Sequence, residues 1–142
     1  MSKSLNIAAG LIAIVDVIGI AYALQNLFLV PIDEGLLGVT ISQIRAFSPN
    51  VLNQIISLFQ FTGLYMFGTT SSAAIIALLP YRKGEKWAWY TQLIIGGIAL
   101  IGQLVLVYIA GNLLPAYMLP FNIVLIILWL IGIFLPIKEF FS

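Results

Sequence analysis

The chain has 142 residues, of which 62% are hydrophobic and 8% are charged. A soluble globular domain is about 25% charged, so this composition excludes that class and indicates an integral membrane protein. A net charge of +1 gives no field that would gather nucleic acid. The chain has no cysteine and no histidine, which excludes disulfides, Fe–S clusters, and the metal and general-base sites built on thiolate or imidazole. We therefore expect no enzyme, no metal site and no cofactor.

The first apolar run, residues 5–30, exceeds the ~20 residues that a membrane-spanning helix needs. It contains a single charge, Asp16. The sequence Ala21-Tyr22-Ala23 has the small-residue pattern of a signal-peptide cleavage site. The apolar run continues beyond that point, however, so we predict a retained span.

Residues 31–48 predict an outer interfacial segment rather than a span. Pro31 to Gly35 is typical of a turn, because it combines Pro, Asp and Gly. The apolar residues that follow recur at helical spacing opposite polar ones, which favours a short interfacial helix or a folded loop. These apolar residues are Leu37, Ile41, Ile44 and Phe47.

Three further spans are predicted, over residues 49–79, 87–110 and 119–136. Ser48 and Pro49 suit a helix start, since Ser caps free N–H groups and Pro fits the first turn. The second span is long, and its polar first turns should project into the headgroups. We predict an all-α fold, a membrane four-helix bundle with short loops, forming one domain from 1 to 142.

The basic residues predict the orientation of this bundle. If both termini and the loop after the second span share one side, that side carries five of the six basic residues, and Arg45 is left on the other. Such an excess marks the cytoplasmic side. We therefore expect a multi-pass cell-membrane protein with both termini cytoplasmic. The five residues are Lys3, Arg82, Lys83, Lys86 and Lys138.

Asp16 is the candidate functional residue of the first span, because a carboxylate near the bilayer centre must be offset. It shares a stripe of small residues that would face another helix. Counting from span midpoints places it level with residues 61–65 and 96–103, where Tyr65 or Gln103 could donate a hydrogen bond. It would act as a proton- or cation-coupled carboxylate, as a protonated packing residue, or as a contact with another subunit.

Two further sets of residues are candidates for polar packing or binding. In the third span, Gln92 and Gln103 lie on a stripe with small residues, which favours interhelical hydrogen bonding over a polar ligand path. Aromatic residues in the second span favour packing, with a lipid or quinone cavity as the alternative. An interfacial anchor that contacts lipid headgroups is predicted next to the charged loop. It comprises Arg82, Lys83, Lys86, Trp87, Trp89 and Tyr90.

The segment Tyr81 to Tyr90, YRKGEKWAWY, resembles the loop between the second and third spans of small four-helix membrane proteins of the DoxX-like and domain-of-unknown-function families. The resemblance covers this segment and the four-span layout. It implies a small four-helix membrane protein and brings no assigned catalytic residues.

The expected function is that of a non-catalytic accessory subunit in a larger membrane complex, for example a respiratory or membrane oxidase/monooxygenase assembly. The chain offers no nucleophile–base pair, metal cage or cofactor motif. Its expected partners are membrane lipids and other integral membrane subunits, and not nucleic acid. Two alternatives remain. One is a homodimeric proton- or cation-coupled transporter using Asp16, and the other is a lipid- or quinone-binding membrane protein.

Overall fold

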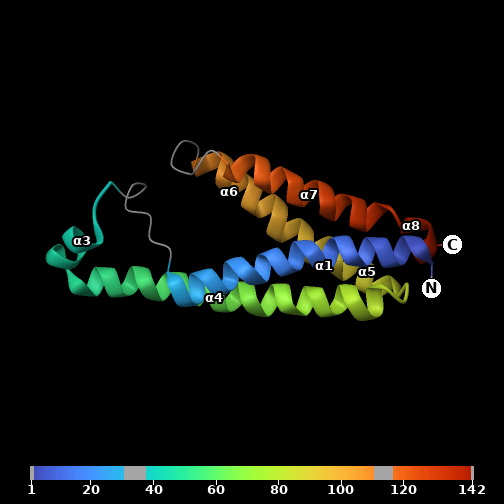
Figure 1. The fold of residues 1–142 in the computed structure, drawn as a ribbon, viewed down its shortest axis with the longest axis horizontal. Helices are drawn as coiled ribbons and strands as arrows, with labels where there is room; N and C mark the ends of the chain where they lie inside the picture. The colour runs from blue at the N-terminus through green and yellow to red at the C-terminus, as the bar shows by residue number, and fades with distance from the viewer. Residues whose placement is uncertain (1, 31–37, 111–116, 142) are drawn as a thin grey trace. The chain divides into compact units, whose positions relative to one another are not determined.

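The computed structural model describes residues 2–30, 38–110 and 117–141 (Figure 1). Within these ranges all regular secondary structure is helical, and three short segments have the wider π geometry. The elements are α1 (Lys3–Leu24), η1 (Gln25–Leu29), α3 (Ile41–Phe47), α4 (Pro49–Ile76), η2 (Ala77–Tyr81), α5 (Lys86–Gly96), η3 (Gly97–Ile101), α6 (Gly102–Ala110), α7 (Met118–Phe134) and α8 (Ile137–Phe141).

Four of the continuous helices are long and apolar enough to cross a membrane. Because every regular element in the described ranges is helical, the described part of the chain is all-α, as the sequence predicts. The four long apolar helices are those of a multi-pass membrane protein. The helices cover Lys3–Leu29, Pro49–Tyr81, Lys86–Ile109 and Met118–Phe141. The second has 33 residues, or ~50 Å at 1.5 Å per residue, so it extends well beyond a ~30 Å hydrocarbon core.

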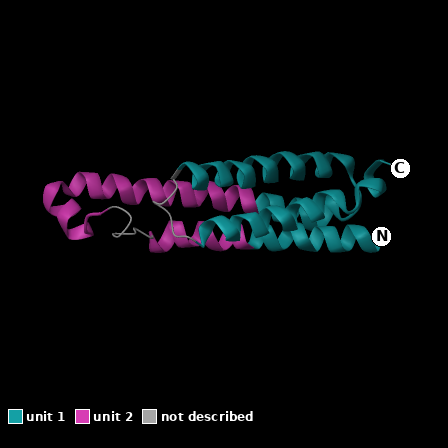
Figure 2. Ribbon diagram, turned by 90° about the horizontal axis from the view of Figure 1, so that it is seen from above, with its two compact units in different colours: residues 1–17, 71–142 teal, residues 18–70 magenta. Residues whose placement is uncertain are grey.

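The helices group into two compact units, coloured separately in Figure 2. Unit 1 comprises Met1–Val17 and Ser71–Ser142, and unit 2 comprises Ile18–Thr70. The helices α1 and α4 each contribute residues to both units. The prediction of a single four-helix bundle domain stays a prediction.

The second predicted span, α4, begins in unit 2 at the residue that the sequence predicts. Ser48 is extended and α4 starts at Pro49. The helix before it, α3, matches the short helix that was one of the two predictions for the end of segment 31–48. It starts with a capping box between Thr40 and Gln43. Residues 31–37 of that predicted segment lie outside the described residues. The two long helices approach closely at Gly63, where an added Cβ would lie 2.8 Å from the carbonyl oxygen of Ala23.

In unit 1 the end of α7 accepts hydrogen bonds from side chains of η2 and α5. Pro136 has no N–H, so it cannot donate to the carbonyl of Gly132 one turn earlier. The Tyr81 hydroxyl donates to this carbonyl at 2.6 Å, and the Trp89 indole N–H donates to the next one, that of Ile133, at 3.0 Å. Both bonds are buried. They fix η2 and α5 against the last turn of α7.

Glycines let the helices of unit 1 pack at short range. A Cβ at Gly132 would meet Ile12 Cγ1 at 2.6 Å, so α1 lies directly on α7 there. A Cβ at Gly96 would overlap the indole of Trp129, so α7 also lies on the end of α5. The space that each missing side chain leaves is filled by the partner helix.

The last residues depart from the predicted short tail after residue 136. They form α8, which lies against the start of α5. Phe140 is buried with its ring centroid 4.9 Å from that of Tyr81, and Phe141 packs edge-on against Trp89 at 5.2 Å. Because both rings bury apolar area against other aromatic residues, the chain folds back instead of extending into water.

Candidate functional site

Gln92 is the best-connected buried polar residue of unit 1. Only 1% of its surface is exposed. Its Nε2 donates to the carbonyl of Ala73 at 2.6 Å, and its own carbonyl accepts from Trp129 Nε1 at 3.3 Å. One residue of α5 thus contacts both α4 and α7, and its amide serves packing rather than a ligand path.

Asn122, on α7, has the opposite character. It is 1% exposed, and both amide atoms, Nδ2 and Oδ1, are buried without a hydrogen-bond partner among the described residues. From the contact of Trp129 with Gln92 and Gly96 in the antiparallel α5, Asn122 lies level with about residues 101–103. A buried amide without a partner costs free energy, ~1–3 kcal/mol from mutational data. Asn122 is therefore a buried polar position of unit 1 whose hydrogen bonds are not made by the described residues.

Asp16 is partly buried, and its Oδ2 also lacks a hydrogen-bond partner among the residues that the structure describes. Its level on α4 differs from the predicted one, residues 61–65. In unit 2 Gly19 faces Thr70. Following α1 back and α4 onward by three residues each puts Asp16 level with Ala73. The difference arises because the polar first turns of α4 shift the midpoint of that long helix.

No hydrogen bond joins Asp16 to either of its two predicted donors in the described part of the chain. Tyr65 belongs to unit 2, is 63% exposed and contacts Phe61 edge-on at 4.7 Å. Gln103 is exposed on α6. Within unit 1, Gly132 faces Ile12 and Trp129 faces Gly96, which places Asp16 near the level of Gly96. Gln103 is about two turns farther along.

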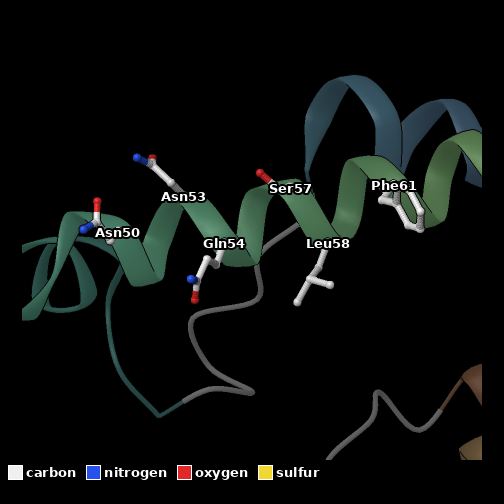
Figure 3. Close-up of a pocket in the computed structure, with 6 residues that line it drawn as sticks. All are labelled: Asn50, Asn53, Gln54, Ser57, Leu58 and Phe61. Carbon is white, nitrogen blue, oxygen red and sulfur yellow. The ribbon is translucent and has the colours of Figure 1, made fainter.

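The first turns of α4 border an open hollow of about 620 Å³ in unit 2. Figure 3 shows Asn53 and Ser57 on one side of the helix and Gln54 and Leu58 on the other. Because these side chains diverge, they do not form the convergent set of polar groups that a small-molecule site requires. Neither do any three acidic side chains in the described ranges lie close enough together to hold a metal ion.

The charged end of unit 1 gathers the predicted interfacial anchor and both chain ends (Figure 1). Arg82 Nε donates to Asn6 Oδ1 at 2.6 Å, and Lys86 Nζ lies 5.8 Å from the ring centroid of Phe141. Trp87 and Tyr90 are half exposed, while Trp89 is buried. The anchor predicted from sequence is thus divided: Trp89 holds α7, and the other five residues remain at the surface.

Comparison with known proteins adds no assignment. No protein-family model matches the chain, and no significant match was found among curated proteins or solved structures. No family match supports the resemblance of the 81–90 loop to DoxX-like proteins, and the four apolar helices agree only with the general class of multi-pass membrane proteins.

Sequence reasoning missed Asn122, Asn6 and Phe140. Asn122 offered the clearest signal, because it is an amide two residues after Pro120 in an otherwise apolar span. Asn6 and Phe140 gave no signal of their own, since each matters through a contact with a residue far away in the chain.

Asn122→Leu should stabilise the protein, because the change removes an unpaired amide and keeps the number and branching of the side-chain heavy atoms. We expect the free energy of unfolding in detergent to rise by about 1–3 kcal/mol, measured as a denaturant or thermal midpoint. Asn53→Leu on the exposed start of α4 is the matched control and should change it by less than about 0.5 kcal/mol. A loss of stability in Asn122→Leu would show instead that the amide has a polar partner.

Proposed function

We propose that the chain is a non-catalytic accessory subunit of a larger membrane complex, and that the third span carries its contact with another subunit. The proposal rests on one observation: Gln103 is exposed within an apolar helix that is long enough to cross the bilayer. Hydrocarbon offers its amide no hydrogen-bond partner, whereas a neighbouring helix can.

The surroundings of Gln103 support a close helix–helix contact. Ala99 and Gly102 are exposed one turn before it and beside it. Apart from the adjoining residues and the backbone of its own helix, no described atom lies within 4 Å of the position that a Cβ on Gly102 would occupy. Small residues next to a polar one let two backbones approach and share a hydrogen bond. We call Ala99, Gly102 and Gln103 the small polar face.

A second surface is available outside the bilayer. The first turns of α4 expose Asn50, Asn53, Gln54 and Ser57, and this helix is longer than one crossing requires. A partner's extramembrane part would dock on these side chains. A respiratory or membrane oxidase/monooxygenase assembly is the setting we propose.

The orientation that we propose follows from charge. The ends of the chain and the loop after α4 lie together at the charged end of unit 1, through hydrogen bonds from Ser4 to Glu139 and from Arg82 to Asn6. These segments carry five of the six basic residues. By the positive-inside rule this end faces the cytoplasm.

Extraction from native membranes in mild detergent, followed by native mass spectrometry, tests the proposal. We expect this chain in a heteromeric assembly at a fixed copy number. Gly102→Ile should lower the co-purified partner about fivefold, because it blocks an approach worth ~1 kcal/mol and disturbs no described contact within the chain. Ile94→Phe adds bulk at another exposed position of the same span and should leave the assembly intact. A chain recovered only as a monomer or homodimer would refute the proposal.

A coupled transporter is the second candidate, and the unpartnered Oδ2 of Asp16 favours it. A carboxylate that no described group neutralises can bind and release a proton or cation during transport. Asp16→Asn should then reduce proton-coupled flux in proteoliposomes at least tenfold, while Asp16→Glu keeps part of it. Flux that persists unchanged in Asp16→Asn would exclude this role.

A further inference from the structure

The charged end of unit 1 has an excess of cations that its own carboxylates do not neutralise. Five basic side chains and two carboxylates, Glu85 and Glu139, meet there and give a net charge of +3. All five cations are exposed. They come from the start of α1, the turn after η2, the start of α5 and α8. These cations are Lys3, Arg82, Lys83, Lys86 and Lys138.

The two carboxylates at this end are occupied by neutral donors. Glu139 Oε1 accepts from the Ser4 hydroxyl at 2.9 Å, and Glu85 Oε2 accepts from the Trp87 indole N–H at 2.5 Å. Within the described ranges neither carboxylate forms an ion pair with a lysine or arginine. The cations are therefore available to an external anion.

Arg82 is the cation whose geometry is set. Its Nε donates to Asn6 Oδ1 at 2.6 Å, which fixes the plane of the guanidinium. The two terminal nitrogens on the opposite edge form no hydrogen bond with described residues. That edge presents the parallel N–H groups that bind the oxygens of a phosphate in a bidentate manner.

The aromatic residues next to Arg82 indicate which anion it would meet. Trp87 and Tyr90 follow it on α5 and are about half exposed, as aromatic residues of the membrane–water interface are. The cations just before them therefore lie at the level of the lipid headgroups. Phosphate is the anion that every phospholipid carries there, and an anionic lipid adds a net negative charge.

We propose that the charged end of unit 1 binds the phosphate of an anionic phospholipid headgroup, with Arg82 as the phosphate ligand and Asn6 as the residue that orients it. Lys83 and Lys86 follow Arg82 in sequence and supply nearby positive charge. The inference requires only that the chain lies in a membrane. It is independent of the accessory-subunit proposal.

Lipid retention tests this site. The full chain is reconstituted in nanodiscs of phosphatidylcholine and phosphatidylglycerol, extracted mildly, and weighed by native mass spectrometry with its bound lipids. Wild type should retain phosphatidylglycerol preferentially. Arg82→Gln should lower the retained ratio of phosphatidylglycerol to phosphatidylcholine about fivefold. Asn6→Leu keeps the charge and should lower it about twofold to threefold, as should Arg82→Lys.

Arg45→Gln is the matched control, because it removes one exposed cation from α3 in unit 2. It should leave the ratio unchanged. An equal loss in Arg45→Gln and Arg82→Gln would overturn the proposal, since net charge alone would then explain retention. Wild-type retention by Arg82→Gln would overturn it as well, and so would displacement of the lipid by excess inorganic phosphate. If Arg82→Gln does not fold, Asn6→Leu against Arg45→Gln decides.

Discussion

A proline near the end of the fourth span leaves a backbone carbonyl without its helical donor. Within a membrane, such a group costs several kcal/mol unless another donor reaches it. Tyr81 provides this donor for Gly132, and Trp89 does the same for Ile133. The rest of the charged end depends on these two bonds. They bring η2 and α5 to α7, and α8 then covers Tyr81 and Trp89 with two phenylalanine rings.

This arrangement separates two kinds of polar residue in unit 1. The side chains of Tyr81, Trp89 and Gln92 donate hydrogen bonds to carbonyls of neighbouring helices. Their polar groups therefore hold the helices together. Asn122 and Asp16 keep buried atoms without partners, and Gln103 is exposed in an apolar span. Polar groups in a membrane that the chain leaves unpaired are places where a proton, an ion or another subunit can interact. They underlie both proposed functions.

The number of apolar helices and the clustering of charge could be predicted from sequence, because hydropathy and the placement of lysine and arginine are local properties. The start of α4 at Pro49 could also be predicted from sequence, because helix capping depends on residues within one turn. The pairing of Tyr81 with Gly132 was not, because the two residues are 51 positions apart. Pro136 signalled that α7 would end, but the donor to the freed carbonyl depends on the register of two helices. The same limit applies to the level of Asp16 on α4, because counting from span midpoints does not allow for the polar first turns of that helix. Its true level follows from the glycine contacts.

We propose that four helices cross the membrane and leave both termini and the 81–86 turn on one side of it. The chain has no cysteine, so single cysteines can be introduced at Ser2, Lys83 and Lys138, and at Ser42 in α3. Labelling of intact cells with a membrane-impermeant thiol reagent then reports the side of each position. We expect the cysteines at positions 2, 83 and 138 to stay unlabelled until the cells are lysed. The cysteine at position 42 should be labelled from outside. Labelling of Ser42 together with Lys83, or of Ser2 apart from Lys138, would contradict it.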